Sequence, residues 1–445
     1  FRFDGLRLDA VHAIFDSGER HILEELAGEV RKAVEQEAGS QEAGSLKAGS
    51  QEAASPAAPR HVSLVLENDD NQAKFLGHIQ TGKATETTGE TTAKGAGGEE
   101  RRASYDAQWN DDAHHIYHHL LTGEEGGYYR DYVKRPQNKL AQALGQGFVY
   151  TGQPSPFRGG ASRGEPSGHL NPAAFVDFLQ NHDQVGNRAM GERIHELCSR
   201  EAVAAATAVL LLSPSVPLLF MGQEWGSRQP FPFFCDFSGE LAAAVTQGRR
   251  REFAAFPRFQ DPKARDEIPD PNALTTFQSA KLRWEDKDTE EGRWWLTLHQ
   301  RLLSLRQERI VPMVRRMKGG ESRFEAQPPV VWAAWEVSGA SSGPGASSET
   351  GASSEPGASS EPGASSEPGS QRLELLCNLS HRGGVWRPRE EGLWRATERE
   401  WIYGSPDEVF GAPGERERED GAREVAPWAV GVWFSKARGR KGQGD

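Results

Sequence analysis

The chain opens with the segment Phe1-Arg2-Phe3-Asp4-Gly5-Leu6-Arg7-Leu8-Asp9-Ala10-Val11-His12. Leu6 and Leu8 alternate with small or polar neighbours, and this alternation predicts a short strand. Asp9 is the last residue before the pattern turns helical, and Arg7 shares its face of the strand. A (β/α)8 barrel keeps its catalytic groups at the C-terminal ends of its strands. An arginine keeps a neighbouring carboxylate ionised, which suits a nucleophile. A purely structural Arg–Asp pair is the alternative.

Length and composition allow a barrel with an appended domain. The 445 residues include 12 Trp and 20 Phe, enough to bury a sizeable core. A formal net charge of −12 provides no basic field, so nucleic acid is not an expected partner. The cysteines, Cys198, Cys235 and Cys377, form no metal-type pair, and their odd number favours a reducing, cytoplasmic location.

Two further features of the sequence concern its cellular context. No apolar run approaches the ~18 residues of a membrane span, and no secretory signal is present, so we expect no membrane partner. The chain begins with Phe1, inside the predicted strand. We therefore expect it to be part of a longer protein.

Alternation of strand-like and helical runs predicts the fold class. Further strands that end in polar residues are expected at residues 62–67, 105–112, 175–183 and 217–224. Helical patterns at residues 21–34 and 200–212 separate some of them. We predict an α/β fold, a partial (β/α)8 TIM barrel in which about five of the eight strands are present. An amphipathic helix at residues 294–309 should follow. Short apolar runs then predict a small antiparallel β-domain, at residues 330–337, 373–379, 393–396 and 429–434.

These patterns divide the chain into two predicted domains. Residues 1–310 should form the partial catalytic barrel, and residues 311–437 the C-terminal β-domain, with a loose tail at 438–445. Gly, Ala, Ser, Thr and Glu dominate three segments, which lack the apolar residues to order themselves. We expect disordered insertions at residues 37–59, 81–102 and 338–370.

Three acids stand at predicted strand ends: Asp9, Glu67 and Asp183. Strand ends far apart in sequence converge at the mouth of a barrel, and two carboxylates flanking a bond are the minimum for glycoside hydrolysis. Partial burial and neighbouring acids would raise the pKa of Glu67, as a general acid requires. Each acid taken alone is better explained as an ordinary loop carboxylate, and it is the presence of three at predicted strand ends that favours a catalytic site.

The same residues carry a family resemblance. Residues 3–12 and 178–183 resemble the nucleophile region and the last conserved region of the α-amylase superfamily of glycoside hydrolases. Within it, the maltooligosyltrehalose trehalohydrolase family is the most similar. The specific markers lie at residues 108–115, 121–124, 127–129, 148–153, 182–188 and 219–225.

The resemblance implies roles for individual residues. Asp9 would be the nucleophile, Glu67 the proton donor and Asp183 the transition-state stabiliser. The implied reaction releases trehalose by retaining hydrolysis of the α-1,4 bond next to a trehalose unit, with no cofactor and no metal. The implied substrate contacts are Arg7, Leu8, Ala10, Val11, His12, Trp109, Asn110, Asp111, Asp112, Ala113, His114, His182, Gln184, Val185, Gly186 and Asn187.

The sequence also departs from this family. Its N-terminal β-domain, its three earlier barrel strands and the superfamily's first conserved region are absent, and Glu67 lies unusually far after Asp9. Another α-glucan enzyme, such as a branching enzyme or amylase, and an inactive glucan-binding fragment remain alternatives. His114 with His118, and His115 with His119, have the i, i+4 spacing of metal ligands, but histidine clusters alone are weak evidence. Oligomeric state is undetermined.

Overall fold

A computed structural model describes residues 3–47, 61–77, 105–254, 256–338, 371–387, 398–405 and 422–436. The described residues form a five-stranded sheet in the order β1-β2-β3-β4-β5, in which every neighbouring pair is parallel. The strands are β1 (Gly5–Leu8), β2 (Ser63–Leu66), β3 (Ala107–Trp109), β4 (Phe175–Phe178) and β5 (Val216–Leu218). The strands expected in the N-terminal part are therefore confirmed. They lie next to one another in the sheet in the same order as in the sequence.

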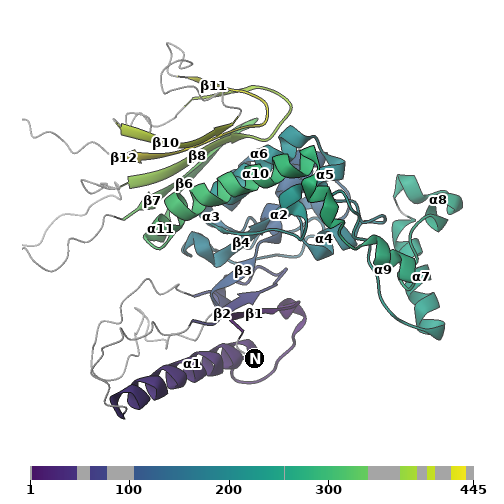
Figure 1. Cartoon of the computed structure of the whole chain (residues 1–445), viewed down its shortest axis with the longest axis horizontal. Helices are drawn as coiled ribbons and strands as arrows, with labels where there is room; N and C mark the ends of the chain where they lie inside the picture. The colour runs from purple at the N-terminus through teal and green to yellow at the C-terminus, as the bar shows by residue number, and fades with distance from the viewer. Residues whose placement is uncertain are drawn as a thin grey trace, which may run out of the picture.

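Helices connect and flank these strands (Figure 1). They are α1 (Ile22–Lys47), α2 (Asp111–Thr122), α3 (Pro136–Gln146), α4 (His182–Gly186), α5 (Ile194–Leu197), α6 (Arg200–Leu212), α7 (Gly239–Phe253), α8 (Pro262–Asp266), α9 (Leu274–Ser279), α10 (Glu290–Leu305) and α11 (Val311–Val314). A π-helical turn, η8 (Arg306–Ile310), separates α10 from α11. Figure 1 shows α7, α8 and α9 projecting away from the rest of the structure.

The local sequence explains where these helices begin. Asn110 caps α2 by accepting from the backbone N–H of Ala113, and acids occupy the first turn, where the helix dipole favours them. Ser199 caps α6 and Thr289 caps α10 in the same way. The helix expected at residues 200–212 is confirmed with those bounds. The amphipathic helix expected at 294–309 begins earlier, at Glu290, because its cap is Thr289.

A second, antiparallel sheet follows in the order β10-β12-β8-β7-β6. Its strands are β6 (Met317–Gln327), β7 (Val330–Val337), β8 (Gln371–Asn378), β10 (Glu398–Ser405) and β12 (Ala429–Lys436), and a small ladder joins β9 (Gly384–Trp386) to β11 (Arg423–Val425). The expected antiparallel sheet is confirmed. Sequence analysis missed β6 and β10, because glycines and charged residues interrupt their apolar pattern. The run at residues 393–396 lies outside the described residues.

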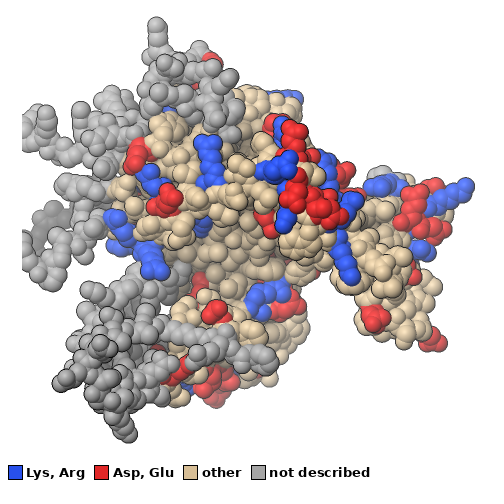
Figure 2. Space-filling view, viewed as in Figure 1, with Lys and Arg blue, Asp and Glu red and all other residues tan. Residues whose placement is uncertain are grey.

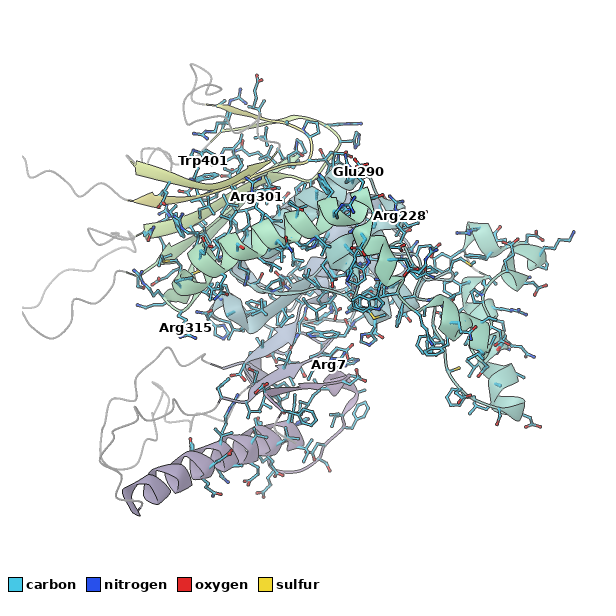
Figure 3. All side chains as sticks on the ribbon, in the orientation of Figure 1. Arg7, Arg228, Glu290, Arg301, Arg315 and Trp401 are labelled. Carbon is cyan, nitrogen blue, oxygen red and sulfur yellow. The ribbon has the colours of Figure 1, made fainter. Side chains whose placement is uncertain are left out.

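One hydrophobic core spans the parallel and antiparallel parts. It includes Leu210 of α6, Leu302 of α10, Leu375 of β8 and Val432 of β12, all fully buried. The guanidinium of Arg301 on α10 lies over the ring of Tyr403 in β10, at 5.6 Å (Arg301 is labelled in Figure 3). The antiparallel sheet therefore packs directly on the helices, and the division expected at residue 310 remains a prediction.

The first insertion is partly helical, contrary to expectation. Helix α1 continues past Glu37 to Lys47. Ala, Glu, Gln and Lys favour helix, and extending an existing helix costs far less than starting one. Residues 48–60 and the tail at 438–445 lie outside the described part of the chain, as do the second insertion and nearly all of the third.

Acidic and basic side chains lie interspersed on the face seen in Figure 2. Among the described helices, none combines the length and the apolar character needed to cross a bilayer.

Candidate active site

The three predicted acids follow the C-terminal ends of neighbouring parallel strands. Asp9 follows β1, Glu67 follows β2, and Asp183 lies in the first turn of α4 after β4. Because β1 pairs with β2 in register, from Gly5 opposite Ser63 to Leu8 opposite Leu66, Asp9 and Glu67 emerge side by side. Gly5 allows this close pairing, since a Cβ there would lie 2.7 Å from the carbonyl oxygen of Ser63.

Arg7 contacts two of these acids. Its guanidinium pairs with the carboxylate of Asp9, and its Nη2 lies 2.8 Å from Oε2 of Glu67. Figure 3 labels Arg7 on β1. The guanidinium also lies over the ring of Trp109, 4.0 Å from its centroid. Trp109 therefore has one face covered by Arg7, which leaves less of the ring for the predicted contact with a substrate.

The backbone after Asp9 adds a further hydrogen bond. Ala10 has a left-handed conformation, with φ of 45°, and its N–H donates to Oε2 of Glu67 at 2.9 Å. An L-residue other than glycine is strained there, by about 1–2 kcal/mol. The strained turn thus points the N–H of Ala10 at the carboxyl group of Glu67, the candidate general acid.

The environment separates the pKa values of Asp9 and Glu67. Hydrogen bonds with Glu67 and with Arg7 lower the pKa of Asp9. Burial raises the pKa of Glu67, as does its hydrogen bond with Asp9, and these effects outweigh the Ala10 N–H and Arg7. One carboxylate ionised and one protonated is the division that a nucleophile and a general acid need.

A cavity of about 200 Å³ opens beside Glu67 and Asp183. Three of the predicted substrate contacts, Asp111, Gln184 and Asn187, line it. Sequence analysis missed its other lining residues. They are Asp69, His115, Tyr128, Asp131, Tyr132, Ser155, Phe157, Arg158 and Arg163. Asp9 and Trp109 are not among the residues that line this cavity.

Several predicted substrate contacts lie beneath the surface. Asn110 and Asp112 have no exposed surface, and His114 is 1% exposed with its Nδ1 2.8 Å from the carbonyl oxygen of Leu179. These side chains support the site and cannot contact a substrate where they lie. The buried members of the predicted set are Val11, Asn110, Asp112, Ala113, His114, Val185 and Gly186.

The remaining predicted contacts lie nearer the surface. His182 and Asp9 are exposed, and the side chain of Asp183 is 43% exposed, with its Oδ2 3.4 Å from Nε2 of His182. Nδ1 of His12 accepts from the backbone N–H of Asp69 at 3.3 Å. Leu8 is half-buried and packs against the core between α1 and the sheet. His12 and Leu8 therefore stabilise the strand ends.

An ionic network supports the cavity, and two of its members, Arg163 and Asp69, line it. Arg163, which is 5% exposed, donates to Oδ1 of Asp112 at 2.7 Å and to Oδ1 of Asp69 at 2.9 Å. Oδ2 of Asp112 accepts from the backbone N–H groups of Val149 and Tyr150. The feature of the sequence that could have indicated this network is the pair of arginines in the glycine-rich stretch at residues 151–165.

Among the described residues, no group of three or more His, Cys, Asp or Glu side chains is placed to hold a metal ion. His118 contacts Glu124 at 2.8 Å, and Glu124 in turn pairs with Arg188. The histidines of α2 therefore have partners within the protein or stack on tyrosines, as His118 does on Tyr129.

Comparisons with known proteins agree with this geometry. A crystal structure of a Salmonella typhimurium protein assigned as an α-amylase matches with a TM-score of 0.69 and 32% identity, over 97% of this chain and 57% of that one. No family model matches the chain. The parallel sheet, its strand-end acids and this likeness define the class, the α-amylase superfamily of glycoside hydrolases.

Curated relatives narrow the assignment. Malto-oligosyltrehalose trehalohydrolases from Deinococcus radiodurans, Saccharolobus solfataricus and Arthrobacter ramosus are 35%, 33% and 36% identical. The matches cover 69%, 69% and 68% of this chain, and 42%, 43% and 45% of those relatives. Over this part of its length, the chain is similar to the malto-oligosyltrehalose trehalohydrolase family. It spans less than half the length of these relatives.

Proposed function

We propose that the chain carries the catalytic acids of a retaining glycoside hydrolase that releases trehalose from maltooligosyltrehalose. The observation that carries this proposal is the pairing of Asp9 and Glu67 through Arg7, with Glu67 and Asp183 opening on one cavity. The substrate follows from the curated relatives, which bear the name of that activity. The bond cleaved is the α-1,4 bond next to the trehalose unit.

Each acid has a distinct role in this proposal. The carboxylate of Asp9 attacks the anomeric carbon while Glu67 gives its proton to the glycosidic oxygen, so trehalose leaves with a free hydroxyl. Glu67, now ionised, takes a proton from water, and the water oxygen displaces Asp9 from the anomeric carbon. Asp183 stabilises the positive charge that develops on the sugar ring. The two displacements together retain the anomeric configuration.

We propose further that the parallel sheet is part of an eight-stranded barrel. Its strands run in sequence order, and both outer strands, β1 and β5, leave apolar side chains accessible: Leu6 is 43% exposed and Val216 is 38% exposed. Three more parallel strands would cover these edges and close the barrel. In this proposal residues 1–310 form the barrel part and residues 311–437 the β-domain.

A fusion protein tests both proposals. The part of the D. radiodurans relative that precedes its matched region is fused to Phe1, and the relative itself serves as the positive control. We expect the fusion protein to release trehalose from maltooligosyltrehalose, and its Asp9→Asn variant to release none. An inactive but folded fusion protein would support an inactive glucan-binding role. Release of maltose or glucose, or formation of branches, would indicate an amylase or a branching enzyme.

A cytoplasmic location is also proposed. All three cysteines lie in the described part of the chain and are free thiols, as in proteins of reducing compartments. Fractionation of the source cells with antibodies to the chain would test this, and recovery outside the cytoplasm would refute it.

A further inference from the structure

Four polar side chains that line the cavity contact one another, and we call them the polar wall: Asp111, His115, Tyr128 and Gln184. Three of them are linked in a chain. The hydroxyl of Tyr128 donates to Oε1 of Gln184 at 3.0 Å, and Nε2 of Gln184 donates to Oδ1 of Asp111 at 3.2 Å. These hydrogen bonds fix the orientation of the wall before any sugar binds.

His115 differs from the other members of the polar wall. It is 5% exposed, and its Nδ1 is buried without a hydrogen-bond partner in the described part of the chain. Its ring packs on Tyr128, with centroids 4.4 Å apart, and on Tyr132 at 5.2 Å. A buried polar atom without a partner costs free energy, so its presence calls for an explanation, such as a role in the site or an ordered water.

The position of the cavity indicates which part of a substrate it holds. Glu67 lines the cavity and Asp9 does not. A proton donor sits beside the leaving group, whereas a nucleophile sits behind the sugar that it attacks. The cavity therefore reaches the leaving-group side of the cleaved bond at Glu67, and it also reaches the attacked sugar at Asp183.

We propose that His115 is a specificity-determining residue, whose imidazole hydrogen-bonds a hydroxyl of the leaving disaccharide within the polar wall. This inference rests on the proposed function, which makes that disaccharide trehalose. A hydroxyl both donates and accepts, and a neutral imidazole does the same, so the two are matched. Burial, together with His114, Arg163 and His118, lowers the pKa of His115 well below its usual value and keeps the ring neutral.

The preference for a trehalose end should depend on this contact. A site built to hydrogen-bond a particular hydroxyl discriminates strongly against a ligand that leaves its polar groups unpaired. Maltose, the leaving group from a plain maltooligosaccharide, presents its second glucose through a 1,4 link and not a 1,1 link. Its hydroxyls therefore meet the polar wall in different positions.

The first test compares two substrates with the same number of glucose units, maltotriosyltrehalose and maltopentaose. His115→Phe keeps the ring packing but loses both nitrogens. In the fusion protein it should lower kcat/KM for maltotriosyltrehalose, relative to kcat/KM for maltopentaose, by about tenfold. His119→Phe on the same helix is the matched control, since His119 lies off the cavity, and it should keep the wild-type ratio. A folded His115→Phe protein with the wild-type ratio would overturn the inference.

The second test uses the unmodified chain, so its outcome does not depend on whether a variant folds. Trehalose and maltose are titrated separately into the unmodified chain, and histidine ring signals are followed by NMR. Trehalose should shift the His115 signals at concentrations where maltose does not, and equal or absent shifts would overturn the inference. The proposed function fails separately, if the wild-type fusion protein releases no trehalose from maltotriosyltrehalose.

Discussion

Nη2 of Arg7 lies 2.8 Å from Oε2 of Glu67, while the same guanidinium pairs with Asp9. One arginine therefore acts on both candidate catalytic acids. It lowers the pKa of each, against the burial that raises the pKa of Glu67. Sequence analysis assigned Arg7 to Asp9 alone.

Replacing Arg7 should shift the whole pH profile. Arg7→Met removes a cation that lowers both pKa values. Asp9 must be ionised to attack, so the acid limb of kcat/KM moves to higher pH. Glu67 must be protonated, so the alkaline limb moves in the same direction. Arg7→Lys keeps the charge and should shift the limbs less, although loss of the planar fork should still lower kcat, roughly 100-fold. An unshifted profile for Arg7→Met would contradict the shared role.

The two acids should respond differently to a good leaving group. Asp9→Asn in the fusion protein should abolish turnover of every substrate, because no covalent intermediate forms. Glu67→Gln should retain only the first step, fluoride release from an α-maltosyl fluoride, since fluoride needs little protonation to leave, and it should lose cleavage of maltooligosyltrehalose. Fluoride release measures the first substrate and trehalose release the second. Equal losses on both substrates for Glu67→Gln would argue against its role as proton donor.

Ala10 provides a test of backbone geometry. Its φ of 45° is tolerated by alanine but excludes β-branched side chains. Ala10→Val should destabilise the protein by roughly 1–2 kcal/mol. It should also lower activity by moving the N–H that donates to Glu67. Ala10→Gly should stay within about 1 kcal/mol of wild type, because relief of strain offsets the added freedom of the unfolded chain. Urea unfolding monitors stability, and a stable, active Val variant would show that the turn can relax.

The Arg163–Asp112 pair tests the support of the cavity. Their side chains are 4% and 0% exposed, so Arg163→Met leaves a buried carboxylate without its cation and should cost about 3–5 kcal/mol. Asp112 also holds Val149 and Tyr150 through their N–H groups, so Asp112→Asn should be costly on its own. The double variant should lose less stability than the sum of the two single variants, as urea unfolding would measure. Additive losses would show that the two side chains act independently.

The sequence by itself determined the features that depend on local pattern. Alternation located the parallel strands, the Ala-rich run located α6, and residues 3–12 and 108–115 pointed to the family. Asp9, Glu67 and Asp183 could be chosen because a barrel places its chemistry at strand ends. The position of an acid at the end of a strand can be read from the sequence without knowing how the strands pack.

Only the tertiary structure decided which side chains of α2 face the cavity. Successive side chains on a helix point about 100° apart, so His114 and His115 cannot face the same way. The contacts of His114 with Leu179 and of His115 with Tyr128 determine which of the two faces the cavity. Asp112, which a motif comparison makes a substrate contact, turns inward because Arg163 approaches it from a loop far along the chain. Such contacts between distant segments leave no periodic trace in sequence. The buried charge and the unpaired imidazole nitrogen appear only once the chain is folded.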